Sequence, residues 1–157
     1  MVSAAPTLRE VADAVDVAGL EAIMIGNAGA ALLGARVTTE DFDFMIRESP
    51  VNLRKLRRVA DRLGAVLFQP YYPTSRMFRL ERHDGLQVDF LMRVDGVKSF
   101  ESLRSRSDKL DFKDGWSVVV ASLPDIIKSK RAVGRPKDLA ALPELEATQR
   151  EREERGL

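Results

Sequence analysis

Hydrophobic residues recur along this chain with two different periods, which together predict alternating helices and strands. Between residues 51 and 63 the apolar side chains lie three or four positions apart, as on one face of a helix. The short apolar runs at 22–25 and 42–46 are typical of buried strands. Helices are predicted over residues 7–18, 28–33, 51–63, 99–104, 124–133 and from 136 into the tail, and strands over residues 22–25, 42–46, 65–68, 76–81, 87–92 and 116–120.

Several helix ends carry recognisable signals. Thr7 and Glu10 have the spacing of a capping box, which predicts that the first helix begins at Thr7. Gly34 follows the short second helix, a place where glycine commonly ends a helix. Pro143 lacks an amide hydrogen and is expected to interrupt the last helix. The pattern indicates a single α/β (α+β) domain over residues 1–157, with a core at about residues 20–142 and a helical tail over 143–157.

Composition narrows the class of protein. The chain has 157 residues, enough for one domain with its own core, and no cysteine, which excludes disulfides and thiolate metal sites. Its one histidine, His83, leaves little room for a zinc centre or a Ser-His mechanism. The N-terminus lacks the pattern of a signal peptide, and no apolar run approaches the ~20 residues of a membrane span. We therefore expect a cytoplasmic protein without a membrane partner.

Charge is unevenly distributed although the net charge is only +1. Basic residues gather at positions 47–62 and 128–137, and acidic residues gather at 144–154. Arg54, Arg58 and Arg62 are four residues apart and are interpreted as an ordinary solvated helix face, with nucleic-acid contact as the alternative.

Two aspartates at strand spacing are the main candidates for chemistry. Residues i and i+2 of a strand point to the same side, so Asp41 and Asp43 project together while Phe42 and Phe44 enter the core. Adjacent carboxylates repel each other unless a cation lies between them. The alternative is that both are strand-edge charges on a solvated face.

A third aspartate, Asp89, is the one charged residue in an apolar strand pattern. A lone buried carboxylate is costly unless it is paired or bound to metal. Three aspartates on two neighbouring strands supply the oxygen ligands that suit Mg²⁺. The alternative is that Asp89 forms a salt bridge with an arginine.

These residues resemble the signature of the nucleotidyltransferase superfamily that includes DNA polymerase β. The signature is Gly-Ser or Gly-Gly, then Asp-x-Asp or Asp-x-Glu, then a distant third Asp, and it is similar to Gly26-Asn27, Asp41-Phe42-Asp43 and Asp89. Residues 126–142 look like the closing motif of small bacterial members, the AbiEii and mycobacterial MenT toxins of toxin–antitoxin systems among them. Asn27 replaces the usual Ser or Gly, but it tolerates turn geometry and can still hydrogen-bond a phosphate.

The resemblance implies a small mixed sheet flanked by helices and a role for each matching residue. Asp41, Asp43 and Asp89 would hold two Mg²⁺ ions, or Mn²⁺ in their place. Gly26 and Asn27 would approach the nucleotide phosphates, and Asp138 would orient a lysine rather than bind metal. Whether Lys130 or Lys137 is the main phosphate ligand stays open. The residues implied as further helpers in nucleotide binding are Arg36, Arg131 and Arg135.

The resemblance also implies a function. A toxin of this type transfers a nucleotide from an NTP, with CTP or another pyrimidine favoured, to the 3′ end of tRNA, and this blocks aminoacylation and translation. A cognate antitoxin, for which a kinase is one option, would relieve the block. The alternatives are AMP transfer to a protein, modification of a small molecule such as an antibiotic, and a binding module without catalysis.

Two further residue groups carry hypotheses. Thr39 lies two positions before Asp41, and phosphorylation there would add about −1.5 to −2 charge and block the triphosphate position. The alternative is a threonine that simply favours the strand. Tyr71, Tyr72 and Pro73 are interpreted as packing at a strand end, with stacking on a base as the alternative.

Overall fold

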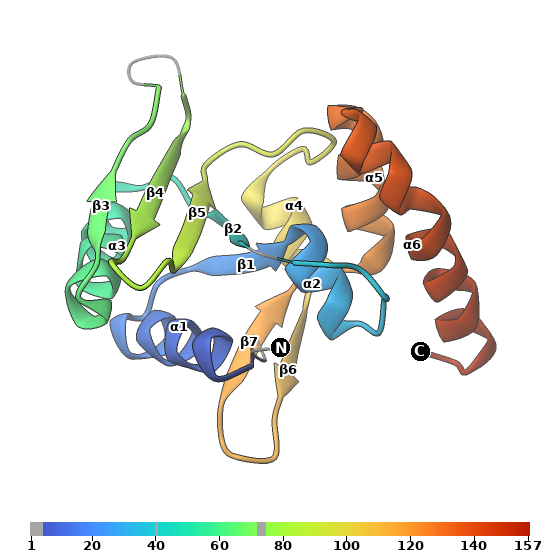
Figure 1. Cartoon of the computed structure of the whole chain (residues 1–157), viewed down its shortest axis with the longest axis horizontal. Coiled ribbons are helices and arrows are strands. Elements are labelled where there is room, and N and C mark those ends of the chain that lie inside the picture. Colours follow the sequence, from blue (N-terminus) through green and yellow to red (C-terminus); the bar gives the residue numbers. More distant parts are fainter. Residues whose placement is uncertain (1–4, 40, 72–74) are drawn as a thin grey trace.

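A seven-stranded mixed sheet forms the centre of the computed structural model, which describes residues 5–39, 41–71 and 75–157 (Figure 1). The strand order across the sheet is β3-β4-β5-β2-β1-β7-β6. The strands are β1 (Ala22–Ile25), β2 (Phe42–Ile46), β3 (Val66–Phe68), β4 (Met77–Glu81), β5 (Gln87–Leu91), β6 (Asp108–Asp111) and β7 (Ser117–Val120). The helices are α1 (Ala5–Ala18), α2 (Gly26–Leu32), α3 (Pro50–Leu63), α4 (Phe100–Ser105), α5 (Leu123–Val133) and α6 (Pro136–Glu154).

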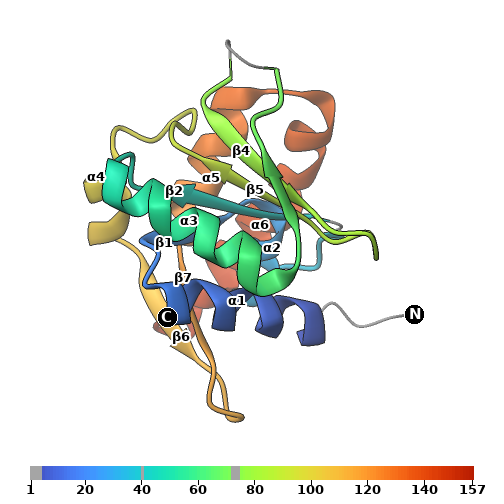
Figure 2. The ribbon, with the colours of Figure 1, turned by 90° about the vertical axis from the view of Figure 1, so that its left-hand side faces the viewer.

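Helices cover the two faces of this sheet in different ways. Helices α1 and α3 lie side by side on one face, whereas α5 and α6 pack together on the other side of the sheet (Figure 2). The short helix α2 contacts β1, β2 and α5. Among the described residues, no helix is both long and apolar enough to cross a membrane.

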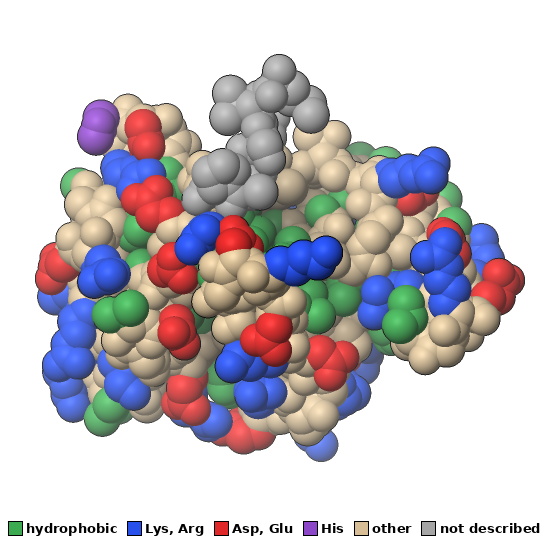
Figure 3. Space-filling view, turned by 90° about the horizontal axis from the view of Figure 1, so that it is seen from below, with side chains coloured by type: hydrophobic (Ala, Val, Ile, Leu, Met, Phe, Trp, Pro, Cys, Tyr) green, Lys and Arg blue, Asp and Glu red, His purple; other side chains and the backbone are tan. Residues whose placement is uncertain are grey.

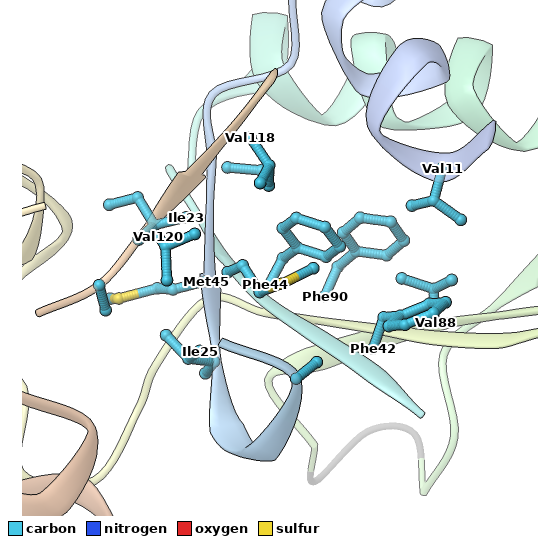
Figure 4. Packing of buried hydrophobic residues seen from close by; sticks show 14 of the residues in the cluster. Val11, Ile23, Ile25, Phe42, Phe44, Met45, Val88, Phe90, Val118 and Val120 are labelled. Carbon is cyan, nitrogen blue, oxygen red and sulfur yellow. The ribbon is translucent and has the colours of Figure 1, made fainter. Parts of the chain in front are cut away.

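One part of the hydrophobic core lies between the sheet and the α1–α3 layer, and buried residues of α2, α4, α5 and α6 belong to the same cluster. Phe44 of β2 and Phe90 of β5 occupy registered positions, and their rings stack with centroids 5.7 Å apart (Figure 4). Val11 of α1 packs in the same cluster and is fully buried. The predicted burial of Phe42 and Phe44 is therefore confirmed, and the alternating residues Asp43 and Met45 face the opposite side of the sheet.

Three details of the predicted elements are wrong. Helix α1 begins at Ala5, so Thr7 lies inside it and cannot be its N-cap. Helix α2 begins at Gly26, earlier than the predicted residue 28. Pro143 does not interrupt α6, because both it and Leu139 are exposed and water can hydrate the carbonyl left without a partner.

Strand β6 was not predicted at all. Its sequence, Asp-Lys-Leu-Asp, lacks the apolar run of a buried strand. It is a strand because all four residues pair with β7 in an antiparallel ladder at the edge of the sheet. Tertiary pairing therefore overrides local propensity here.

Helix α5 is anchored at its N-terminus by a buried carboxylate. Ser122 caps the helix, and its hydroxyl donates a hydrogen bond to Asp125 Oδ2 at 2.7 Å. The Arg106 guanidinium donates to both Asp125 oxygens, with Nε–Oδ2 at 2.9 Å and Nη2–Oδ1 at 3.0 Å. Burial raises the pKa of Asp125, but Arg106 and Ser122 outweigh it and hold this pKa below its ordinary value.

The charge of Asp125 is expected to contribute to stability in a pH-dependent way. Asp125→Asn should lower the free energy of unfolding by about 1–3 kcal/mol at pH 7, because Arg106 loses a charged partner. A carboxyl whose pKa is depressed on folding stabilises above its unfolded pKa of about 4 and loses this effect as pH falls through the folded value. Urea denaturation should therefore show the difference between wild type and variant shrinking below about pH 4.

A control separates this effect from ordinary surface charge. Asp13 is half exposed and its ion pair with Arg9 spans 3.7 Å, so Asp13→Asn should change stability by less than ~0.5 kcal/mol. A pH-independent difference for Asp125→Asn would contradict a role for its charge.

Candidate functional site

Three charged residues lie in one row across neighbouring strands, on the sheet face opposite the phenylalanine core. Asp43 of β2 is registered with Asp89 of β5, and Asp89 is registered with Arg79 of β4. All three line a cavity of about 680 Å³. The cavity extends from this part of the sheet to the junction of α5 and α6.

Asp43 is the most perturbed carboxyl group in the cavity. Burial and the negative charges of Asp89 and Asp41 together raise its pKa to about 6, against the opposing effect of Lys130 and Lys137. Asp41 lies directly before β2 and is exposed, and it lines the same cavity. The predicted same-side projection of Asp41 and Asp43 is therefore what the structure shows.

Gly26 brings the backbone against the Asp43 carboxylate. A Cβ atom on Gly26 would lie only 2.9 Å from Asp43 Oδ2, and the residue has a φ of +68°. Both features require glycine, because a side chain would collide with the carboxylate and strain the left-handed backbone.

Asp89 is held by an arginine, the alternative that its sequence environment left open. Arg79 Nε lies 2.8 Å from Asp89 Oδ1 and Arg79 Nη2 lies 3.2 Å from Oδ2. Neither side chain is fully exposed. Both Asp89 oxygens are therefore engaged in a bidentate ion pair.

The donor set fits a divalent cation in part. Asp41 and Asp43 supply hard oxygen ligands, and the crowding of like charge that raises the Asp43 pKa is what a cation would relieve. Within residues 5–39, 41–71 and 75–157, no three Asp, Glu, His or Cys side chains are close enough to hold a metal together. Asp89 therefore joins such a centre only if Arg79 releases one of its oxygens.

The opposite wall of the cavity is basic. Lys130 of α5 and Arg135 and Lys137 at the start of α6 all line it. Arg135 Nε donates a hydrogen bond to Oδ2 of buried Asp138 at 2.7 Å, and Lys130 Nζ lies 3.7 Å from Asp138 Oδ1. Burial lowers the pKa of Lys130, while Asp138 and Asp43 act in the opposite direction. Asp138 thus holds two cations in place, beside helix α6 and away from the row of Asp43 and Asp89.

Two predicted helpers lie elsewhere. The Arg131 side chain is exposed and forms an ion pair with Glu146 of α6, and it does not line the cavity. Arg36 also lies outside the lining, and its backbone amide donates to Glu144 Oε1 at 2.9 Å. Helical spacing explains this, because Arg131 follows Lys130 by one residue and so points about 100° away from it around the helix.

Asn27 and Thr39 line the cavity and organise the loop before β2. Asn27 Nδ2 donates to the Thr38 carbonyl at 3.1 Å, and the Thr39 hydroxyl donates to the Asp41 carbonyl at 2.9 Å. Asn27 Oδ1 is buried and has no hydrogen-bond partner among the described residues. The side chain of Asn27 therefore ties the loop to α2, and its contact to a nucleotide phosphate stays a prediction.

Several groups in or near the site were not singled out from sequence. Arg79 and Arg93 line the cavity. The one sequence signal that could have identified Arg79 is that it is a charged residue within an apolar strand pattern. Tyr71 lines it too, whereas Tyr72 and Pro73 lie outside the described residues.

The side chains of Arg54, Arg58 and Arg62 are exposed on α3, and basic residues gather along that edge of the molecule (Figure 3). None of these three arginines lines the cavity, in agreement with a solvated helix face.

Comparison with known structures identifies the architecture. The antibiotic-resistance factor ANT(2″)-Ia aligns over 96% of this chain and 91% of its own, with a TM-score of 0.59 and 13% identity. JHP933 from Helicobacter pylori (TM-score 0.48, 17% identity) and a proposed nucleotidyltransferase from H. pylori (0.45, 18%) each align over 80% of this chain. This chain spans only 53% and 55% of those two proteins.

These likenesses establish a fold. No protein-family model matches the sequence, and no curated protein sequence matches it. The agreement with ANT(2″)-Ia and the seven-stranded mixed sheet show a nucleotidyltransferase-like α/β fold, as predicted. The resemblance to toxins of the AbiEii and MenT type stays a prediction.

Gly26→Ala is expected to destabilise the protein and displace the Asp43 carboxylate. The left-handed backbone alone costs an alanine about 1–2 kcal/mol, and the 2.9 Å contact with Asp43 adds to it. Gly64→Ala is the matched control, because Gly64 has a φ of +62° with no atom within 4 Å of an added Cβ. Urea denaturation should show a larger loss for Gly26→Ala, and equal losses would contradict the close approach to Asp43.

Proposed function

We propose that this chain transfers a nucleotidyl group from an NTP to an acceptor hydroxyl. The observation that supports the proposal is that carboxylates and cations lie on opposite walls of one cavity. Asp41 and Asp43 lie on one wall, and the cations of α5 and α6 lie on the other, close enough that Lys130 and Lys137 affect the Asp43 pKa. Such a site suits a polyphosphate on the basic side and its reacting phosphorus near the carboxylates.

The basic wall is proposed to hold the triphosphate. Lys130 and Arg135 are already oriented by Asp138, so little side-chain freedom would be lost when a phosphate binds. Lys137 lines the cavity without an ion pair to any of the described residues, which leaves its charge for the ligand. This arrangement supports Lys130, Arg135 and Lys137 as phosphate ligands and gives no such support to Arg36 or Arg131.

The proposed reaction is an in-line displacement at the α-phosphorus. A bond forms from the acceptor oxygen to this phosphorus, the bond to the bridging β-phosphate oxygen breaks, and pyrophosphate leaves with the electron pair. The hydroxyl proton passes to water. Mg²⁺ or Mn²⁺, when held by Asp41 and Asp43, would neutralise phosphate charge and lower the pKa of the attacking hydroxyl.

The finer proposal is that the acceptor is the 3′ end of tRNA and the donor a pyrimidine NTP such as CTP. It rests on the resemblance of residues 26–142 to AbiEii and MenT toxins, and it implies blocked aminoacylation, arrested translation and a cognate antitoxin. A second candidate is transfer to a small molecule, which the likeness to the antibiotic-resistance factor ANT(2″)-Ia favours. AMP transfer to a protein and a binding module without catalysis are the remaining alternatives.

The transfer proposal is tested with α-³²P-labelled NTPs, Mg²⁺ and total tRNA. Wild type should label RNA, and Asp43→Asn should lose at least about a hundredfold in rate because one carboxylate charge is removed from the reacting centre. Lys130→Met should also lose rate, whereas Arg131→Met is the matched control that should stay near wild type. If protein or an added antibiotic is labelled instead, that molecule is the acceptor and tRNA is not. If no acceptor is labelled, the chain is a binding module without catalysis.

Thr39 is proposed as a site of regulatory phosphorylation. Its hydroxyl lies at the cavity wall beside Asp41, so a phosphate there would add about −1.5 to −2 charge near Asp41 and Asp43 and repel the triphosphate. Intact-mass measurement after co-expression with a neighbouring kinase gene should show one phosphate on wild type and none on Thr39→Val. A phosphate that persists on Thr39→Val would place the modification elsewhere.

A further inference from the structure

An exposed, partly aromatic sheet face adjoins the cavity. On β3 the side chains of Val66 and Phe68 are 68% and 37% exposed, whereas Leu67 between them packs against the core. Because alternate strand residues face opposite sides, Val66 and Phe68 lie on the sheet face away from the core. This is the face that carries Asp43 and Asp89.

Strand register connects this exposed face to the reacting centre. Phe68 is registered with Arg79, which is registered with Asp89, which in turn is registered with Asp43. Phe68 thus lies three strands from Asp43, a distance of about 14 Å at ordinary strand spacing. At that distance Phe68 cannot contact the reacting group of an acceptor bound near Asp43. It can contact the residues of the acceptor that precede this group.

Tyr71 follows β3 in the chain and lines the cavity. It lines the cavity together with Met77 and Arg79, and its side chain is 74% exposed. Its φ is +59°, the one positive value at a non-glycine position among the described residues. A bulky residue rarely adopts this conformation unless its surroundings impose it, and such residues cluster at functional sites. The Ser75 amide donates to the Tyr71 carbonyl at 3.3 Å and closes the loop base.

The geometry of displacement fixes the side from which an acceptor arrives. The attacking and leaving oxygens lie roughly in line on opposite sides of the reacting phosphorus. With the triphosphate on the α5–α6 wall, the acceptor comes from the β4–β5 side, where Tyr71 and Arg79 lie. The exposed face of β3 and β4 is the continuation of this side.

We propose that Phe68 and Tyr71 form a stacking platform for the bases that precede the reacting 3′ hydroxyl of a single-stranded nucleic acid. The proposal rests on the nucleotidyl transfer proposed above. Exposed aromatic rings beside guanidinium groups are what single-stranded nucleic acids bind, because every base has a face that stacks. Arg79, which is registered with Phe68, supplies a guanidinium group at this side, and Arg93 lines the same cavity.

Other occupants fit this face less well. A small acceptor would be accommodated in the cavity and would leave Phe68 without a role. A second copy of the chain would need about 800 Å² on each partner, far more than a three-residue edge strand with two exposed apolar side chains offers.

The test measures binding of a fluorescein-labelled single-stranded RNA with a free 3′ hydroxyl, by anisotropy, in the absence of NTP. Phe68→Leu and Tyr71→Leu should each weaken binding about tenfold, because leucine keeps the apolar volume but cannot stack. Phe68→Tyr and Tyr71→Phe keep a ring and should bind as wild type does. Val17→Ala, at an exposed site on α1, is the surface control.

A separate titration with a fluorescent NTP distinguishes the platform from the proposed function. Unchanged NTP binding in all variants, with RNA binding lost only in the leucine variants, is the expected result. Equal RNA affinity in the leucine variants, or no RNA binding by wild type, would overturn the platform while NTP transfer stands. Loss of a dimer on Phe68→Leu, seen by analytical ultracentrifugation, would also overturn it in favour of a self-interface. Ring-dependent RNA binding without any NTP binding would keep the platform and reject the nucleotidyl transfer.

Discussion

Two carboxylates, Asp43 and Asp89, face each other on neighbouring parallel strands inside a cavity, and their mutual repulsion has to be offset by the residues around them. Burial makes this repulsion stronger because water no longer screens the charges. Burial is the largest cause that raises the pKa of Asp43 to about 6, and the charge of Asp89 is the next. Arg79 offsets the charge of Asp89 by binding both of its oxygens.

The second half of the site follows from the same electrostatic constraint. Lys130 and Lys137 lower the Asp43 pKa from across the cavity, so α5 and α6 contribute to balancing the strand carboxylates. Asp138 in turn holds Lys130 and Arg135, which would otherwise be mutually repelling cations. Negative and positive side chains thus alternate across the cavity. A bound polyphosphate with its metal would extend this alternation of charge.

The scaffold allows this arrangement because the two faces of the sheet have separate tasks. The phenylalanines on one face stack in the core under α1 and α3, while the intervening aspartates face the cavity. The period of two in a strand makes this separation automatic once the phenylalanines are buried. Gly26 completes the arrangement by giving the Asp43 carboxylate the space that a side chain would occupy.

The amino-acid sequence by itself determined the order of most elements, the burial of Phe42 and Phe44 and the shared direction of Asp41 and Asp43. All three features follow from the hydrophobic period and from local spacing, because each depends on residues only a few positions apart. Only the tertiary structure decided that Asp89 pairs with Arg79, that Arg131 points away from the cavity, and that β6 is a strand. Each of these depends on which strand or helix lies beside another, and that choice is made by long-range packing rather than by local pattern.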